Sequence, residues 1–206
     1  MKKLLITALL VFGVAQQVSA ADAAAGKSLA AACGACHGAD GNSAAPNFPK
    51  LAGQNAKYLL KQMGDIKSGA RSVPVMAGQL DSLNKKQMED IAAYYAGQNM
   101  SLGAAKKDLV ALGERVYRAG DRDKGLAACS GCHSPTGQGN EPGGFPKLGG
   151  QHAQYVADQL RAFRTGAEDD VAGRHNDGDT RIMRDVAYRL SDKEIEAVAS
   201  YISGLH

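Results

Sequence analysis

Hydrophobic residues recur with helical spacing along most of this chain. In the segments 55–66 and 152–163, apolar and aromatic side chains fall on one broad stripe of a helix. These positions are Tyr58, Leu59, Met63 and Ile66 in the first segment and Tyr155, Val156, Leu160 and Phe163 in the second. An amphipathic stretch over 108–120 predicts another helix, with 26–33 as its shorter counterpart. No alternating pattern of useful length indicates a strand, so the sequence predicts an all-α protein.

Two capping boxes predict where the last helix of each half begins. Ser191 is followed three residues later by Glu194, and Asn84 stands in the same relation to Gln87. In such a box, each of the two side chains accepts a hydrogen bond from a backbone N–H of the first helical turn. We therefore expect one helix to start near Asn84 and another near Ser191.

The chain contains two copies of one unit. The stretch FPKLAGQNAKYLLKQM from Phe48 matches FPKLGGQHAQYVADQL from Phe145 at an offset of 97, and a later block from Met76 aligns with one from Met183 at an offset of 107. The blocks follow the same order in both halves, which predicts two homologous domains and not a solenoid. The predicted domains are residues 21–105 and 106–206, with the Gly-containing segment 97–107 as the linker.

The first twenty residues have the pattern of a secretory signal peptide. Lys2 and Lys3 precede an apolar run from Leu4 to Val14, and small residues follow up to Ala20. A helix that spans a bilayer needs ~20 apolar residues, so this run is too short for an anchor. We expect cleavage after Ala20 and export of the remaining chain.

Charge and composition narrow the possible partners. Without Lys2 and Lys3, 22 basic residues face 21 acidic ones, a net charge of +1. This is not the electrostatic footprint of a nucleic-acid-binding protein.

The chain has no Trp and only four Phe, so two small domains have few large side chains with which to build a core. This composition suggests a large apolar group that is not an amino acid.

Each half contains one C-x-x-C-H pentad, and these hold all four cysteines. The pentads are Cys33-Gly-Ala-Cys36-His37 and Cys129-Ser-Gly-Cys132-His133. This pattern is the attachment signature of c-type haem. Two sulfurs one helical turn apart can form thioethers with the two vinyl groups of a porphyrin, and the adjacent histidine then binds the iron. Covalent attachment also explains why an exported chain would keep four cysteines without disulfides.

Three other uses of the cysteines are less compatible with the sequence. A disulfide between neighbours inside each pair would close a very small loop and stabilise little. A thioredoxin-like site needs a strand and helix pattern that is missing. A structural zinc site would need four ligands, but the two pairs lie in separate repeats, each with its own histidine.

The repeat selects a second axial ligand for each iron. Met76 is the only methionine that aligns with another methionine, Met183, whereas Met63 and Met88 align with apolar residues typical of a core. We expect both to lie in loop-like stretches and to bind iron. The unpaired histidines, His152, His175 and His206, are interpreted as surface residues.

The hydrogen bonds that orient the axial histidines and the one large insertion give two further expectations. The axial histidines need a backbone carbonyl on the other ring nitrogen. Pro46 and Pro142 are the first candidates, with Pro49 and Pro146 next. The second half carries an insertion within 166–182, whose Asp, Asn and Gly residues do not fit the spacing of a calcium loop, so we interpret it as a solvated loop.

These features together resemble the cytochrome c4 family of periplasmic dihaem cytochromes. The resemblance rests on a signal peptide, two pentads 96 residues apart, the repeated FPKL(A/G)GQ and one methionine late in each half. It implies two tandem class I cytochrome c domains, all-α and related by pseudo-twofold symmetry, with two covalently bound haem c groups whose propionates face across the interface. The implied thioether residues are Cys33, Cys36, Cys129 and Cys132, and the implied axial pairs are His37 with Met76 and His133 with Met183.

The resemblance also implies a function without enzymatic activity. It implies a one-electron carrier of the respiratory chain, with a quinol:cytochrome c reductase type of donor, a terminal oxidase as acceptor and possible weak association with the membrane surface. One alternative is the dihaem subunit of an enzyme complex, such as a sulfide-oxidising flavocytochrome. A dihaem peroxidase is less compatible, because it needs one open iron and a nearby acid or base.

Overall fold

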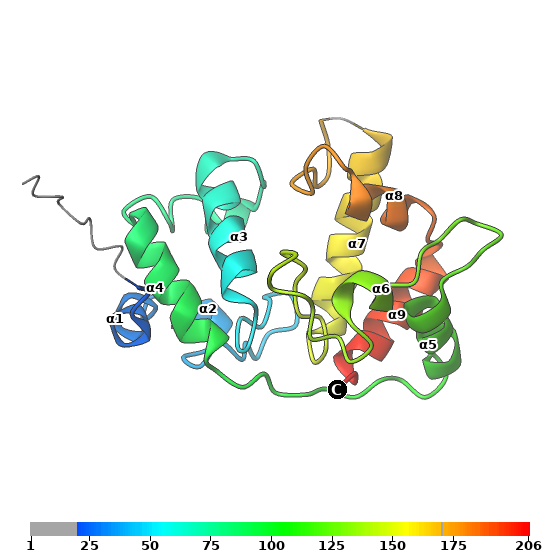
Figure 1. Cartoon of the computed structure of the whole chain (residues 1–206), viewed down its shortest axis with the longest axis horizontal. Coiled ribbons are helices and arrows are strands. Elements are labelled where there is room, and N and C mark those ends of the chain that lie inside the picture. The colour runs from blue at the N-terminus through cyan, green and yellow to red at the C-terminus, as the bar shows by residue number, and fades with distance from the viewer. Residues whose placement is uncertain (1–19, 170) are drawn as a thin grey trace, which may run out of the picture.

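The computed structural model of the chain describes residues 20–169 and 171–206, which form two helical domains side by side (Figure 1). The first domain contains α1 (Ala23–Leu29), α2 (Gly34–His37), α3 (Ala56–Ser68), the 3₁₀ turn η1 (Pro74–Met76) and α4 (Lys85–Ala96). The second contains α5 (Val110–Ala119), α6 (Ser130–His133), α7 (Ala153–Glu168), α8 (Ile182–Tyr188) and α9 (Asp192–Ser203). Two isolated β-bridges are the only β structure in the described part of the chain. The all-α prediction is confirmed.

The predicted signal peptide falls on residues 1–19 and Ala20, and residues 1–19 lie outside the described residues. Export and cleavage after Ala20 therefore stay predictions. Across residues 20–169 and 171–206, no helix combines the length and hydrophobicity needed to cross a bilayer.

The first and last helices of each domain approach each other closely at a glycine. A Cβ on Gly26 of α1 would lie 1.9 Å from the carbonyl oxygen of Asp90 in α4. A Cβ on Gly113 of α5 would lie 2.3 Å from the carbonyl oxygen of Ala197 in α9. Each helix pair can therefore cross at this distance only because the position carries no side chain.

The predicted stripes on α3 and α7 supply core residues in both domains. Leu59 is buried with Ile91 and Tyr95 in the first domain. The larger cluster of the second domain contains Val156 and Leu160 among others. Tyr58 and Tyr155, which share these stripes, instead direct their hydroxyl groups to the other domain.

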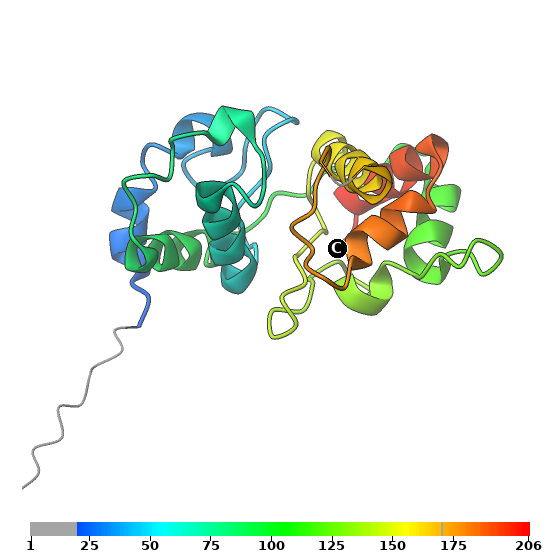
Figure 2. The same ribbon diagram turned by 90° about the horizontal axis from the view of Figure 1, so that it is seen from above.

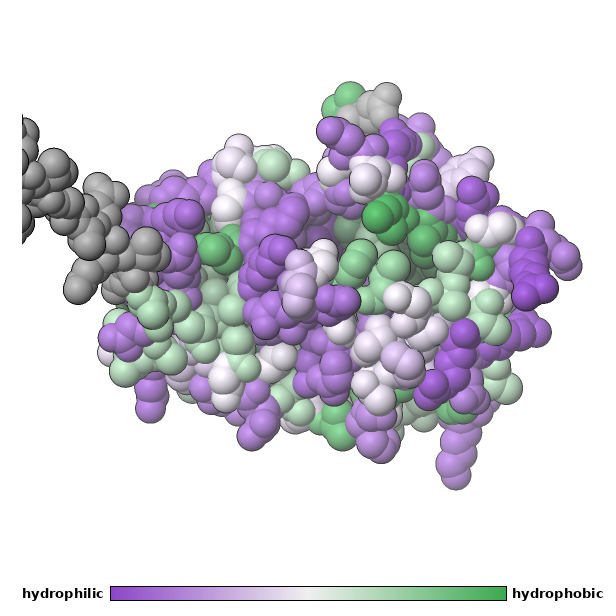
Figure 3. All heavy atoms as spheres, viewed as in Figure 1, coloured by the Kyte–Doolittle hydropathy of each residue, from purple (hydrophilic) through white to green (hydrophobic). Residues whose placement is uncertain are grey.

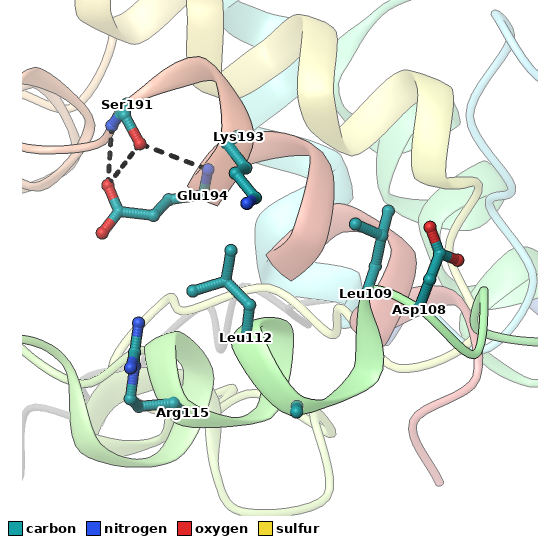
Figure 4. Close-up of a pocket in the computed structure, with 8 residues that line it drawn as sticks. Asp108, Leu109, Leu112, Arg115, Ser191, Lys193 and Glu194 are labelled. Atoms are coloured by element: carbon teal, nitrogen blue, oxygen red, sulfur yellow. Dashed lines mark hydrogen bonds between the residues drawn. The ribbon is translucent and has the colours of Figure 1, made fainter.

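Both predicted capping boxes are present. Asn84 Oδ1 accepts a hydrogen bond from the N–H of Gln87 (3.0 Å), and the side chain of Gln87 accepts from the N–H of Asn84 (2.9 Å). Ser191 and Glu194 form the same pair at the start of α9 (Figure 4). The surface hollow beside this cap, between the first turns of α5 and α9, contains none of the predicted haem residues.

The two FPKL(A/G)GQ repeats meet at the domain interface. Gln151 Oε1 accepts from the N–H of Lys50 (2.9 Å), and Gln151 Nε2 donates to the carbonyl of the same residue (2.9 Å). Gln54 makes the equivalent pair of bonds with Lys147, both at 2.8 Å. Such reciprocity is expected of two domains related by an approximate twofold axis.

The predicted linker, residues 97–107, runs along one edge of both domains (Figures 1 and 2). Asn42 Nδ2 donates to the carbonyl of Asn99 (2.9 Å), and the N–H of Gly103 donates to the carbonyl of Ser203 (2.9 Å). Met100, between these contacts, is buried. The linker is therefore bonded to each domain in turn and is not a free tether.

Candidate functional site

A cavity of about 1340 Å³ extends through both domains and across their interface. It is lined by all the predicted haem residues, namely Cys33, Cys36, His37 and Met76 from the first domain and Cys129, Cys132, His133 and Met183 from the second. Single small-molecule sites are commonly ~300–1000 Å³, so this cavity is large even for one sizeable ligand. On the face shown in Figure 3, hydrophobic side chains gather on the second domain in the region of α6 to α8.

The two pentads fold as single helical turns. The N–H of His37 donates to the carbonyl of Cys33 (3.0 Å) around α2, and the N–H of His133 donates to the carbonyl of Cys129 (2.9 Å) around α6. Residues three apart on a helix lie on the same face. The two sulfurs of each pentad are therefore placed to contact one flat ligand.

Each pentad histidine is oriented by a proline carbonyl. His37 Nδ1 lies 3.0 Å from the carbonyl oxygen of Pro49, and His133 Nδ1 lies 3.0 Å from that of Pro146. A carbonyl can only accept a hydrogen bond, so Nδ1 must carry the proton. The lone pair of Nε2 is left to bind a metal.

The first candidates for this contact, Pro46 and Pro142, were wrong, and Pro49 and Pro146 make it instead. The reason is a backbone turn that reverses the chain after each pentad. The N–H of Leu51 donates to the carbonyl of Gly41 (2.7 Å), and in the second domain the N–H of Leu148 donates to Gly137 (2.7 Å). This long-range closure brings the later proline beneath the imidazole.

Burial sets the protonation of the site residues. Burial lowers the pKa of His37 and His133, although the bond to the proline carbonyl opposes this shift. Both imidazoles are therefore neutral near pH 7, the form that binds metals. Burial also raises the pKa of the Cys33 thiol, and that of Cys129 to about 11, so neither is a thiolate without further chemistry. Among the described residues, no three His, Cys, Asp or Glu side chains gather into a group that could hold a metal ion.

The two methionines lie in different local structures. Met76 ends η1 and follows the strongly exposed Val75, in agreement with the loop-like prediction. Met183 lies in the first turn of α8 and packs against the core of its domain. The loop-like prediction for Met183 was wrong, and the spacing of Ile182 and Val186 is the sequence signal that could have indicated the helix.

The unpaired histidines have other partners. His152 was predicted to be a surface residue, but it is partly buried and its Nε2 contacts the carbonyl (2.9 Å) and Oγ (3.0 Å) of Ser43 in the other domain. His175 lies at the cavity edge with Nε2 2.9 Å from the carbonyl of Asp169. His206 is exposed.

The chemistry of the cavity fits covalent haem. Apolar walls suit a porphyrin and a pair of thiols can attach it, while a neutral imidazole nitrogen and a thioether are the iron ligands of c-type cytochromes. The rings of Phe48 and Phe145 meet the imidazoles of His37 and His133 edge-on, at 6.2 and 6.1 Å between centroids. Tyr95, which also lines the cavity, has a buried hydroxyl without a partner among the described residues.

Sequence reasoning missed a cationic part of the wall. Arg71 and Arg174 both line the cavity at the domain interface, and each is only 8% exposed. Arg174 belongs to the insertion that was predicted to be a solvated loop, so this prediction was wrong for its central residues. An isolated arginine in a polar loop gives no sequence signal of burial.

Comparisons with known proteins agree with this chemistry. A sequence profile of the cytochrome c family matches residues 23–97 and again 110–206. The chain is 57% identical to cytochrome c4 of Pseudomonas aeruginosa and 54% identical to cytochrome c4 of Azotobacter vinelandii, in both cases over all of both chains. The crystal structure of reduced recombinant cytochrome c4 from Pseudomonas stutzeri is similar with a TM-score of 0.86 and 55% identity, covering 91% of this chain and all of that one.

Proposed function

The chain belongs to the cytochrome c4 family of dihaem class I cytochromes c, which are electron carriers and not enzymes, and we propose that it carries single electrons between redox proteins of a respiratory chain in the periplasm. The observation that supports this best is found twice. In each domain a proline carbonyl fixes the proton on Nδ1 of a buried histidine, in a cavity that the paired cysteines and a methionine also line.

We assign the residues as follows. Cys33 and Cys36 attach the first haem, and Cys129 and Cys132 attach the second. The axial pairs are His37 with Met76 and His133 with Met183. Haem bound in this way supplies a one-electron couple between ferrous and ferric iron.

The residues around the haem would determine its protonation, its reduction potential and the access of other molecules to the iron. Each histidine keeps its proton on Nδ1, held by a proline carbonyl, and so would bind iron as a neutral ligand through Nε2. The thioether of methionine is a ligand that raises the reduction potential of haem iron. If a histidine and a methionine of each domain both bind the iron, they would leave no site for a substrate, so the haem would exchange single electrons without bond formation.

Export and partners complete the proposal. The apolar run and the small residues before Ala20 support a cleaved signal peptide and a periplasmic location. Membership of the family supports redox proteins as partners, with a quinol:cytochrome c reductase type of donor and a terminal oxidase as acceptor. Weak association with the membrane surface is part of the same proposal, as are domain limits at 21–105 and 106–206.

The test is an analysis of the holoprotein purified from the periplasm of a haem-attaching host. We expect the mass of the chain from residue 21 plus two haems, and colour that acid-acetone does not extract. Met76→Ala and Met183→Ala should each remove about half of the far-red band of sulfur bound to ferric iron. Met63→Leu is the control, because Met63 packs in the core where the repeat has Leu160.

Three results would contradict the proposal. A far-red band unchanged in Met183→Ala would show that the axial ligand was wrongly assigned. A high-spin ferric haem at neutral pH with turnover of hydrogen peroxide would indicate a peroxidase. Purification in a stable complex with a flavoprotein would indicate the enzyme-subunit alternative.

A further inference from the structure

Two buried arginines, one from each domain, meet at the interface beside the haem cavity. Arg71 follows α3 of the first domain, and its Nη1 donates to Gln62 of the same domain (2.9 Å). Its Nη2 crosses to the second domain and donates to the hydroxyl of Tyr155 (3.0 Å) and to Oε1 of Gln159 (2.9 Å). The guanidinium group of Arg71 therefore makes more hydrogen bonds to the other domain than to its own.

Arg174 makes the equivalent contacts from the second domain to the first. Its Nη1 donates to Gln159 of its own domain (2.7 Å), and its Nη2 donates to Oε1 of Gln62 (2.9 Å) and to the hydroxyl of Tyr58 (3.4 Å) in the first domain. Gln62 and Gln159 are equivalent in the repeat, as are Tyr58 and Tyr155. Both glutamine oxygens therefore accept from both arginines, which closes one network across the interface.

The insertion of the second domain places Arg174 in this network. The segment 173–177 lies on α7, where the N–H of Arg174 donates to the carbonyl of Ala162 (2.9 Å). A Cβ on Gly166 would lie 2.5 Å from the carbonyl oxygen of Arg174, so the backbones touch directly. The guanidinium also stacks over the ring of Phe163, 4.3 Å from its centroid. In the view from above, this segment faces α3 of the first domain (Figure 2).

The network holds two positive charges without matching negative ones. Among the described residues, neither Arg71 nor Arg174 forms an ion pair with a carboxylate. Asp65 lies close enough for its negative charge to favour the charged form of Arg71, but the same carboxylate also binds Lys61 and Asn176, so one negative charge faces three positive ones. Two like charges that share acceptors repel each other, and burial strengthens the repulsion. Such a pair needs anionic charge nearby, and porphyrin carboxylates in the same cavity are the natural source.

We propose that Arg71 and Arg174 form a single cationic cluster that acts on both haems, so that the electron affinity of each haem depends on a residue of the other domain. The inference rests on the proposed function and deepens it, because it assigns the insertion a role as the element that supplies the second charge. A positive charge near a haem favours the added electron. Removal of either arginine should therefore lower the potential of both haems.

The test is a spectroelectrochemical titration of the haem-loaded full chain. In Arg71→Gln and in Arg174→Gln, we expect both haems to be reduced at lower potential, so that both reduction steps of the titration move. For each haem, the equilibrium constant for reduction should fall by roughly 3- to 10-fold. Arg122→Gln removes the same charge from the exposed loop between α5 and α6, far from the interface, and should move neither step (Figure 1). Arg71→Lys keeps the charge and should leave both steps near those of the unmodified protein.

Two outcomes would overturn the inference while leaving the proposed function intact. In the first, Arg174→Gln moves only one of the two steps, which is a local effect. In the second, Arg71→Lys moves both steps as far as Arg71→Gln does, so that charge is not the cause. Haem content and the far-red bands, measured on the same samples, report separately on the proposed function.

Discussion

The two domains bind their histidines in the same way but support their methionines differently. Met76 lies in a 3₁₀ turn whose internal bonds come from the backbone, such as the N–H of Met76 to the carbonyl of Val73 (2.8 Å). Met183 lies in α8, which packs on the core of its domain. The buried ion pair between Arg184 of α8 and Asp177, which precedes the helix, holds this helix in place (2.7 Å). The two proposed methionine ligands therefore have different structural support within one chain.

The cores show the same asymmetry. The buried cluster of the second domain has twelve members among the described residues, and that of the first has five. Two helices of the first domain are also shorter than their counterparts, with seven residues in α1 against ten in α5 and thirteen in α3 against sixteen in α7, whereas α4 and α9 both have twelve. The first domain has less protein core and should depend more on its haem for stability.

The largest effect is expected where the two domains are most alike, at the glycine crossings. Gly26→Ala and Gly113→Ala each place a Cβ against a backbone carbonyl, which cannot rotate away. We expect each to lower the free energy of unfolding of its domain by about 3–4 kcal/mol. Urea unfolding of the holoprotein measures this.

Gly64→Ala is the matched control. Gly64 lies in α3 with open space around its missing Cβ, so alanine should be neutral or slightly stabilising. If Gly113→Ala unfolds at the same urea concentration as Gly64→Ala, the close crossing of α5 and α9 does not contribute to the stability of the second domain.

An intermediate effect is expected from the ion pair that only the second domain has. In Asp177→Asn, Arg184 keeps a hydrogen-bond acceptor but loses its counter-charge, which weakens the support of α8. Added imidazole should displace Met183 from ferric iron roughly tenfold more easily, equivalent to ~1.4 kcal/mol. The loss of the far-red band during an imidazole titration measures this.

The unmodified protein gives the reference for this titration. Its first haem should lose methionine at a lower imidazole concentration than its second, because the turn of Met76 is less supported. Asp179→Asn removes an exposed carboxylate two residues away and should change nothing. If Asp177→Asn and Asp179→Asn lose the far-red band at the same imidazole concentration, the ion pair does not stabilise the bond between Met183 and iron.

The smallest effect concerns pH and the two capping boxes. Burial raises the pKa of Glu194, but hydrogen bonds from Lys124 and Ser191 outweigh it and bring the pKa to about 2. Because this is below the ordinary value of ~4.3, the folded state gains stability that is full above about pH 4.3 and is lost as the pH falls toward 2. Gln87, the equivalent residue, has no such titration.

Glu194→Gln makes the second cap resemble the first. We expect it to cost about 0.5–1 kcal/mol of unfolding free energy at pH 7, because solvent screens part of the charge, and progressively less at lower pH. Urea unfolding at pH 7 and pH 3 compares the variant with the unmodified protein. A cost that stays constant between these pH values would show that the carboxylate charge does not stabilise the cap.

Local signals predicted the local structure well. The capping boxes mark the starts of α4 and α9 because the pattern satisfies backbone donors within one turn. The aligned pentads and methionines selected eight residues that all line one cavity. The helix around Met183 was not predicted, since the spacing of Ile182 and Val186 within seven residues is a weak signal of a helix.

The sequence by itself determined the longer helices, the duplication and the candidate haem residues, because spacing along a chain fixes which side chains share a helical face or a turn. Only the tertiary structure decided which proline carbonyl orients each histidine and that His152 and Arg174 are held at the interface. These contacts join residues far apart in the chain. Their free energy depends on how the chain packs within and between the domains, and a local sequence pattern contains no information on that packing.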